Sequence, residues 1–313
     1  QRLTTFEVSG GGFSLFGDVP ADRMLTAYGL MEFTDMARVF PVDPDFVSRA
    51  AQWLIAQQDS DGSWENDRGL VHESTWANLG NDRVPVTAYI SWALVHAGYG
   101  DDPATQRGLT YTREHAHEVE DPYALALVAN ALAAAEPQGD FTRQVMDRLA
   151  AKAVTDGNTA YWQSDVATMM GSEGKTGSLE TTALAAYALI STELHPDLAN
   201  KALTYLIQEK DPNGTWYSTQ ATILALKALL KSITATGEQA KASVTVAVNG
   251  AQKQPVQITP ETYDVVHVLT FDDITPGEND VRIAVEGKGN LMAQITTRYY
   301  LPWADVPLEV SAG

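Results

Sequence analysis

The chain has 313 residues, of which 44% are hydrophobic, so it can bury one large core or two modest ones. A formal net charge of −19 argues against binding to nucleic acid or to an anionic membrane surface, because both need basic patches. The absence of cysteine excludes a disulfide, a thiolate nucleophile and a cysteine-ligated metal within these residues.

The first part of the chain is predicted to form helical hairpins. After a strand-like piece and a glycine-rich turn at 1–17, apolar residues at helical spacing predict a helix from Ala21 to Phe40. The Asp43-Pro44 cap predicts a second helix that ends near Gln58, and a long loop from Asp59 to Arg83 follows. Further helices are expected near Pro85–Ala97, Pro103–Val119, Pro122–Glu136, Phe141–Thr155, Leu179–Thr192, Asp197–Glu209 and Ser218–Ile233.

Two kinds of helix alternate along this part of the chain. The helices that begin at Pro85, Pro122 and Leu179 are apolar all round and must be buried on every side, whereas the others carry charge on one face. The alternation predicts inner helices wrapped by outer ones, which is an α/α toroid; an open helical bundle is the alternative. The turns also repeat, since Gln57–Trp64 and Gln208–Trp216 share a glycine-aromatic pattern, with a weaker copy from Gly10.

After Thr236-Gly237 the hydrophobic period changes from that of a helix to that of a strand. The stretch SVTVAVNG alternates and ends on the Asn249-Gly250 hairpin signal. Further strands are expected at Val256–Thr259, Asp264–Phe271, Asp280–Glu286 and Leu291–Leu301. The sequence thus predicts two domains: an α/α toroid at 1–237 and a small antiparallel β-sandwich segment at 238–303, with 304–313 as a tail or the start of another domain. So few strands indicate that part of the sandwich lies outside this chain.

Several stretches resemble the alpha-macroglobulin family, which includes the thioester-containing complement components. The stretch GTWYSTQATILALKALL resembles a helix near the end of the family's thioester-containing domain, and WLIAQQDSDGSW and DRVPVTAYISWAL resemble earlier parts of it. VTVAVNG through AQITTRYYLPW resembles the second part of a split CUB-like domain. The resemblance covers most of Gln1–Trp303 and is strongest to bacterial members. It implies an (α/α)6 toroid that is incomplete at its N-terminus, because the family's thioester motif would lie upstream.

The resemblance also implies a function. It identifies the chain as a fragment of a bacterial, broad-spectrum protease inhibitor that is extracellular, periplasmic or at the cell surface. Such a protein traps proteases after bait cleavage, with or without covalent attachment by a thioester upstream of this chain. It is not an enzyme, because trapping does not turn over. Its expected partners are target proteases and the neighbouring macroglobulin domains of the same chain, and it needs no cofactor.

His72 is the residue to which the resemblance gives a chemical role. In some family members a histidine in the loop after the Asp-Gly-aromatic turn attacks the thioester and forms an acyl-imidazole. His72, in GLVHESTWANL, has the matching place, and Glu73 would orient its imidazole. The plain alternatives are a capped loop histidine and a solvated glutamate. Trp64 and Trp76 are interpreted as packing residues of the turn, with a shield over the acyl group as the alternative.

The alternative function is an α/α-toroid enzyme with a β appendage, either terpene-cyclase-like or glycoside-processing. A cyclase needs an acidic cluster, and the nearest match is Asp43-Pro44-Asp45. A glycoside-processing enzyme needs two carboxylates across a central cavity. Glu180 is the inner-helix acid that stands out, and an acid at a helix N-terminus is its plain interpretation.

The sequence predicts no metal site. His115 and His117 lie two residues apart, and side chains at that spacing do not share a helix face. The stretches Asp59–Gly62 and Asp211–Gly214 resemble calcium loops but lack the glutamate that ends such a loop. Turn chemistry, with glycine at positive φ, explains both.

Overall fold

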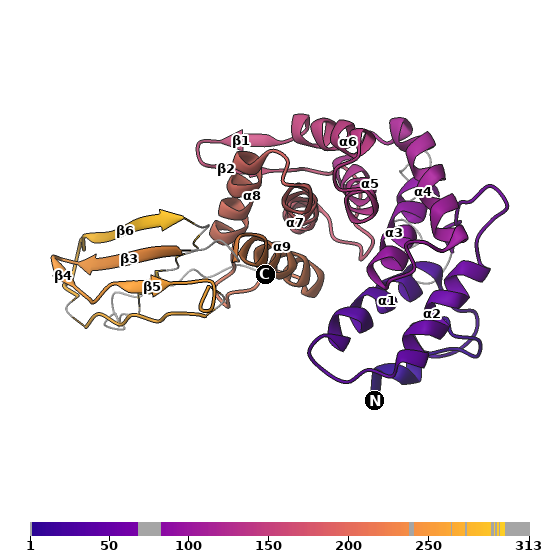
Figure 1. The fold of residues 1–313 in the computed structure, drawn as a ribbon, viewed down its shortest axis with the longest axis horizontal. Helices are drawn as coiled ribbons and strands as arrows, with labels where there is room; N and C mark the ends of the chain where they lie inside the picture. Colours follow the sequence, from indigo (N-terminus) through magenta and orange to yellow (C-terminus); the bar gives the residue numbers. More distant parts are fainter. Residues whose placement is uncertain are drawn as a thin grey trace, which may run out of the picture. The chain divides into compact units, whose positions relative to one another are not determined.

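The structure of the chain is a computed structural model that describes residues 2–67, 83–237, 241–263, 265–272, 274–288, 291, 293 and 295–297. The chain divides into two compact units, Gln1–Ala235 and Thr236–Gly313. The described residues of the first unit are mainly helical, and those of the second contain a small sheet (Figure 1).

Nine α-helices are present in the described part of the chain, close to the predicted positions. Asp43, Asp102 and Asp121 each accept a backbone N–H at the start of a helix whose next residue is proline, which fixes where these helices begin. The helices are α1 (Arg23–Ala37), α2 (Pro44–Ala56), α3 (Arg83–His96), α4 (Pro103–His115), α5 (Pro122–Ala135), α6 (Asp140–Ala151), α7 (Gly174–Thr192), α8 (Pro196–Gln208) and α9 (Thr219–Gly237). Short 3-10 helices lie at Arg2–Phe6 and Ala116–Glu118.

The helices are arranged in two layers. α1, α3, α5 and α7 pack against one another in chain order, and α2, α4, α6 and α8 each pack on the odd-numbered helix before them. Figure 1 shows α3, α5 and α7 inside α4, α6 and α8. α3, α5 and α7 are buried along most of their length, whereas α6 and α8 bury one face each, as the pattern of charge predicts. This alternation confirms an inner layer of apolar helices and an outer amphipathic layer.

A repeated tryptophan joins each of three outer helices to the next inner helix. Trp64, Trp162 and Trp216 are fully buried. The indole N–H of each donates to a carbonyl in the last turn of the outer helix, and the backbone N–H donates to a threonine hydroxyl of the inner helix. The three sets are Leu54–Trp64–Thr87 (2.8 and 3.0 Å), Leu149–Trp162–Thr182 (2.6 and 3.1 Å) and Leu206–Trp216–Thr222 (2.6 and 3.1 Å).

The weaker copy predicted from Gly10 has half of this arrangement. The backbone N–H of Phe13 donates to the hydroxyl of Thr26 in α1 at 2.8 Å. Phe13 is buried, as the tryptophans are. The repeated turns are therefore a structural device that positions the start of the inner helices, and the interpretation of Trp64 as a packing residue is confirmed.

The connection between α6 and α7 differs from the prediction. The helix expected to reach Thr155 ends at Ala151, and a short hairpin of β1 (Val154–Asp156) and β2 (Thr159–Tyr161) follows. α7 begins at Gly174 rather than at Leu179. Two glycines make this first turn a poor helix by propensity. Close packing overrides the propensity, since a side chain at Gly177 would place Cβ 3.0 Å from the Ser172 carbonyl oxygen.

The second unit contains an antiparallel sheet, whose described strands are β3 (Lys241–Val248), β4 (Ala251–Gln252), β5 (Val256–Ile258) and β6 (Val281–Lys288). β6 pairs with β3 along its whole length, and β4 and β5 pair with opposite ends of β3. Asn249 and Gly250 both have positive φ, of 50° and 85°, as a two-residue type I′ hairpin requires. This turn was predicted correctly.

The strand expected at Asp264–Phe271 was wrong, because the described residues 265–272 form no strand. Val266 and Val268 on this stretch are largely exposed. Alternation alone does not make a strand when no neighbouring backbone pairs with it. Most of the strand expected at Leu291–Leu301 lies outside the described residues. The predicted fold class, an α/α ring followed by a small antiparallel sheet, is confirmed.

Candidate functional site

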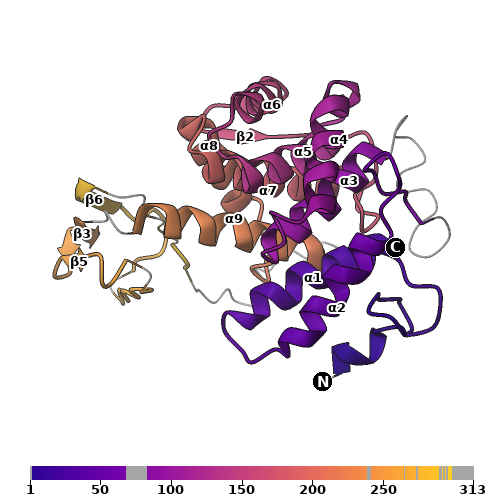
Figure 2. The ribbon, with the colours of Figure 1, turned by 45° about the vertical axis from the view of Figure 1, so that its right-hand side comes forward.

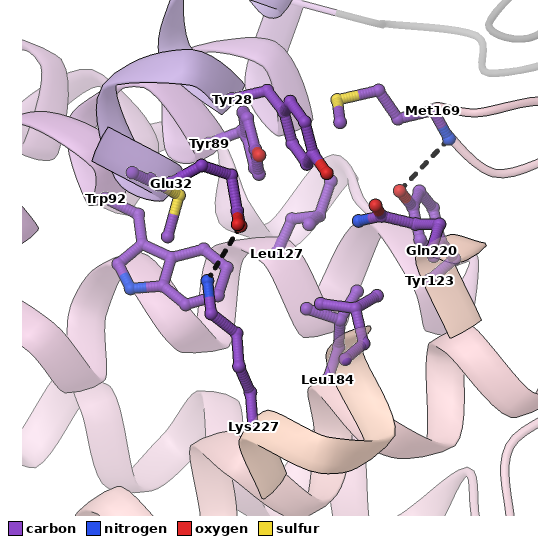
Figure 3. Close-up of a pocket in the computed structure, with 12 residues that line it drawn as sticks. Tyr28, Glu32, Tyr89, Trp92, Tyr123, Leu127, Met169, Leu184, Gln220 and Lys227 are labelled. Atoms are coloured by element: carbon purple, nitrogen blue, oxygen red, sulfur yellow. Dashed lines mark hydrogen bonds and ion pairs between the residues drawn. The ribbon is translucent and has the colours of Figure 1, made fainter. Parts of the chain in front are cut away.

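The inner helices surround a narrow pocket (Figure 3). Each of α1, α3, α5, α7 and α9 contributes to its wall, and the connection before α7 adds one residue. The lining residues are Tyr28, Met31, Glu32, Tyr89, Trp92, Tyr123, Leu127, Met169, Leu184, Gln220, Leu224 and Lys227. The space inside that is open to water is about 20 Å³, enough for about one water molecule. This pocket is therefore too small for a sugar or an isoprenoid, which the two enzyme alternatives would need.

A charged cluster lies beside this pocket and joins the ends of the row of inner helices. The Lys227 ammonium group of α9 lies 3.1 Å from Glu32 Oε1 and 2.8 Å from Asp35 Oδ2 in α1. Nε2 of His96 in α3 lies 2.7 Å from the other Asp35 oxygen. Figure 3 shows the pair of Glu32 and Lys227 facing each other. Because these contacts connect α9 directly with α1, they close the ring on this side (Figure 2).

The charges of this cluster shift each other's proton affinity. Burial alone would raise the pKa of Asp35, but the hydrogen bonds and charges of His96 and Lys227 more than offset it and hold that pKa well below its usual range. Burial would lower the pKa of Lys227, and Glu32 and Asp35 raise it instead. Both groups are therefore charged, and Lys227 is a structural cation.

The inner helices begin at one end of the ring, because the tryptophan turns join the last turn of an outer helix to an early turn of the next inner helix. We call the residues Tyr123, Thr168, Ser172, Glu180 and Ser218 at this end the N-terminal rim. They come from the start of α5, from the turn before α7, from α7 itself and from the turn before α9. The phenol oxygen of Tyr123 accepts the backbone N–H of Met169 at 3.0 Å, as Figure 3 shows.

Glu180 is the acid of this rim. It is fully buried, and its Oε1 accepts the Ser172 hydroxyl at 2.6 Å and the Ser218 hydroxyl at 3.3 Å. Burial raises the pKa of Glu180, and the hydrogen bonds of Ser172, Thr168 and Ser218 offset only part of the rise. Its interpretation as an acid at a helix N-terminus was wrong, because α7 begins at Gly174 and Glu180 is thus beyond the first turn.

His72, Glu73 and Trp76 lie outside the described residues, in the stretch 68–82. The residues on either side of this stretch are held near the starts of two inner helices. The Asp67 carboxylate accepts the backbone N–H of Arg23, the first residue of α1, at 2.6 Å and also pairs with its guanidinium group. The roles of His72 and Glu73 stay predictions.

The calcium-like turns are explained by their own hydrogen bonds. In the first, the guanidinium group of Arg83 lies 3.2 Å from Asp59 and 3.7 Å from Asp61, where a cation would otherwise lie. In the second, the Asp211 carboxylate accepts the backbone N–H groups of Asn213 and Thr215. Among the residues that the structure describes, no group of three or more acidic or histidine side chains could hold a metal ion.

The charged cluster was not predicted from the sequence. The signal that could have found it is Lys227 itself, because it interrupts the apolar run ILALKALL of an inner helix. Glu32 and Asp35 are three residues apart and therefore share one face of α1. A lysine in a fully apolar helix needs opposite charges nearby, and only a helix distant in sequence could supply them.

Comparison with known proteins agrees with this architecture. The model of the A-macroglobulin TED domain, the thioester-containing domain, matches residues 1–231. The chain is similar to ovostatin of Gallus gallus, with 24% identity over 242 residues, which are 73% of this chain and 16% of the length of ovostatin. In the described part of the chain, no helix is both long and apolar enough to cross a membrane. The ring and the family match confirm the resemblance seen in the sequence: the chain belongs to the alpha-macroglobulin family, and residues 1–231 form its TED domain.

Proposed function

We propose that the protein that contains this chain is a broad-spectrum protease inhibitor that traps proteases and does not turn over a substrate. The match of the TED domain over residues 1–231 carries this proposal, since the whole helical ring is of that type. The chain spans only 16% of the length of ovostatin, so the bait and the enclosing surface would come from other parts of the protein. We further propose a bacterial source and a place outside the cytoplasm, in the periplasm, at the cell surface or outside the cell.

The ring supports this role because its inner helices enclose, among the residues that the structure describes, a pocket too small for an organic ligand. The inner helices are closely packed, and the charged cluster ties α9 to α1. The pocket between them holds about one water molecule. A domain of this kind suits movement as a unit after bait cleavage better than it suits binding of a small substrate. The sheet of the second unit would be the second part of the split CUB-like domain.

Covalent attachment is the finer part of the proposal. A thioester needs a cysteine, and these 313 residues contain none, so the cysteine would have to come from outside them. His72 would attack the thioester carbonyl through an imidazole nitrogen and release the thiolate. A hydroxyl group of the protease would then take the acyl group from the imidazole, with the thiolate accepting its proton. Glu73 would orient the imidazole.

Mixing the whole protein with an active serine protease tests the trap. A trap leaves the protease active on a small chromogenic peptide and protects a large protein substrate, because only the small molecule reaches the enclosed active site. Loss of both activities would indicate an ordinary active-site inhibitor, and retention of both would refute inhibition.

A second measurement tests covalent attachment separately. Denaturing electrophoresis of the mixture would show a protease band bound to the inhibitor. The variant His72→Ala should attach much less protease through hydroxyl groups, so its covalent band should be weaker. It should still protect the large substrate. His117→Ala is the matched control, because His117 is exposed and its ring bonds only to the Glu114 carbonyl among the contacts in the structure. Equal bands for both variants would refute the role of His72.

A further inference from the structure

Glu180 is an acid in a place where an ionised carboxylate is costly. It lies in the apolar helix α7 and is fully buried. Within the described residues, its Oε1 accepts hydrogen bonds from two hydroxyl groups, and its Oε2 is buried without a hydrogen-bond partner. A buried polar atom left without a partner costs about 1–3 kcal/mol. The arrangement therefore calls for an explanation other than packing.

We propose that Glu180 is a positioning residue of the N-terminal rim: its Oε1 joins the turn before α7 to the turn before α9, and its buried, unpartnered Oε2 is placed to form a hydrogen bond with a carbonyl oxygen. Its meaning for acyl transfer rests on the proposed function, because Asp67 and Arg83, which flank the stretch that contains His72, lie at the starts of α1 and α3. The connection between the two turns stands on the contacts of the chain alone.

The surroundings of Glu180 favour its neutral form. Among the described residues, the titratable groups that face it are the phenols of Tyr28 from α1 and Tyr123 from α5, which are uncharged at neutral pH. Ser172 and Thr168 face it from the turn before α7, and Ser218 from the turn before α9. None of the ion pairs of the described residues includes Glu180. Burial raises its pKa in the absence of a compensating cation.

The directions of the hydrogen bonds leave one oxygen of the carboxyl group for a proton. The Ser218 hydroxyl oxygen accepts the backbone N–H of Ala221 at 3.0 Å, so its hydrogen is free to point at Oε1 of Glu180. Ser172 also donates to Oε1. Two donors already occupy Oε1, so Oε2 is the oxygen that remains for a proton and for a further partner. A carbonyl oxygen is the commonest acceptor in a peptide or acyl group.

Glu180 thereby controls two turns at once. The turn before α7 is closed by the Thr168 backbone N–H, which donates to the Ser172 carbonyl at 2.9 Å, and by the Ser172 N–H, which donates to the Thr168 hydroxyl at 3.1 Å. Ser218 starts α9 by accepting the Ala221 N–H. The carboxyl group bonds to both turns, although α8 separates them along the chain.

The pH dependence of stability tests the neutral state. The folded protein holds the Glu180 proton more tightly than the unfolded chain, in which the pKa of glutamate is about 4.3. Stability from this group is therefore complete below that pH and is lost as the pH rises through the folded-state pKa. The variant Glu180→Gln keeps the shape and a donor but cannot ionise, so it should escape this loss.

The experiment compares thermal unfolding of the 313-residue chain and its variants from pH 4.5 to 8. Between these limits the Tm of the wild type should fall relative to that of Glu180→Gln by at least about 3 °C, the shift for a roughly tenfold change in the unfolding equilibrium. Glu173→Gln is the matched control, because Glu173 is exposed and makes no cap hydrogen bond, and it should follow the wild type. Parallel curves for wild type and Glu180→Gln would overturn the proposal.

Hydrogen exchange tests the positioning role. In Glu180→Met, which removes every hydrogen bond of the carboxyl group, amide exchange should become at least tenfold faster both at Thr168–Ser172 and at Ser218–Ala221, and Glu180→Gln should protect both turns. Faster exchange at one turn alone would overturn the connection. If Glu180→Met does not fold, the comparison of Tm against pH for the wild type and Glu180→Gln still tests the proposal. Neither measurement depends on protease trapping, so a failed trap assay leaves this inference intact.

Discussion

Replacing Lys227 with methionine tests whether the charged cluster closes the ring. The substitution keeps the length of the side chain and removes its charge. It leaves the Glu32 carboxylate without its cation and leaves Asp35 with His96 as its nearest partner. The helix α9 would then lose its ion pairs with α1. The variant therefore tests a contact between residues that are 195 positions apart in the sequence.

The contacts set the size of the expected effect. Removing one partner of a fully buried ion pair costs about 3–5 kcal/mol. The side chains of Lys227, Glu32 and Asp35 are 25%, 33% and 26% exposed to solvent, so water replaces part of the lost interaction. We therefore expect a loss of about 2–3 kcal/mol, which corresponds to a fall in Tm of roughly 5–10 °C for a unit of this size.

Thermal and urea unfolding of the chain measure this loss, with Lys231→Met as the matched control. Lys231 lies one turn further along α9, where its ammonium group is 5.8 Å from the centre of the Tyr187 ring. The control removes the same charge from the same helix and should change stability by less than about 1 kcal/mol. Equal losses for the two variants would refute the idea that α9 is held by the cluster.

The pH dependence gives a second check on the same variant. Because the pKa of Asp35 is lowered in the folded protein, the stability from its ionised form is present above its unfolded pKa, about 3.9, and is lost as the pH falls below it. Without Lys227 the pKa of Asp35 should move up, so the variant gains less from ionisation. The difference in stability between wild type and Lys227→Met should therefore shrink on acidification below about pH 4.

Three further substitutions test the packing of the ring and the turn of the sheet. Trp162→Phe removes the indole N–H that donates to the Leu149 carbonyl and should cost about 1–3 kcal/mol in urea unfolding, and a loss under 0.5 kcal/mol would contradict its structural role. Gly108→Ala would place Cβ 2.5 Å from the Trp64 ring and should lower the free energy of unfolding by about 1–3 kcal/mol. Gly100→Ala is its control and should be nearly neutral, because its Cβ would meet only ordinary contacts at 3.8 Å or more. Similar losses of stability for the two variants would refute this difference. In Gly250→Ala the new Cβ meets no atom within 4 Å, but alanine must adopt a φ of +85°. The free energy of protection against amide hydrogen exchange in the β3–β4 hairpin should therefore fall by about 1–2 kcal/mol. Unchanged protection would contradict the turn assignment.

The fold could be predicted from sequence where local signals agree. The Asp-Pro caps fixed the starts of α2, α4 and α5, and the apolar surfaces of α3, α5 and α7 predicted the inner layer. These signals act within a few residues of each other, so one sequence is enough to read them. The Asn249-Gly250 turn is of the same kind, because its φ angles follow from the two residues.

The differences arise where distant contacts decide the structure. The first turn of α7 has two glycines and was not expected to be helical, yet the close approach of the Ser172 carbonyl leaves little room for a side chain at Gly177. The stretch 265–271 alternates like a strand but has no paired neighbour among the described residues. The charged cluster was missed for the same reason, because the partners of Lys227 lie in α1. Alternation and propensity carry no information about which segment lies opposite.

Lys227 and Glu180 show how one fold accepts two polar side chains in opposite ways. Lys227 in α9 is partly buried and Glu180 in α7 is fully buried, and in both places an unpaired charge is costly. Lys227 meets two carboxylates from α1, so its charge is kept and its pKa is raised. Among the described residues, Glu180 meets hydroxyls and phenols and no cation, so the same burial raises its pKa and favours its neutral form. The first arrangement connects α9 with α1, and the second leaves a carboxyl oxygen without a partner in the N-terminal rim. A residue that weakens the fold as the pH rises is hard to explain by packing alone, and this is why Glu180, rather than Lys227, is the better candidate for a functional group of this ring.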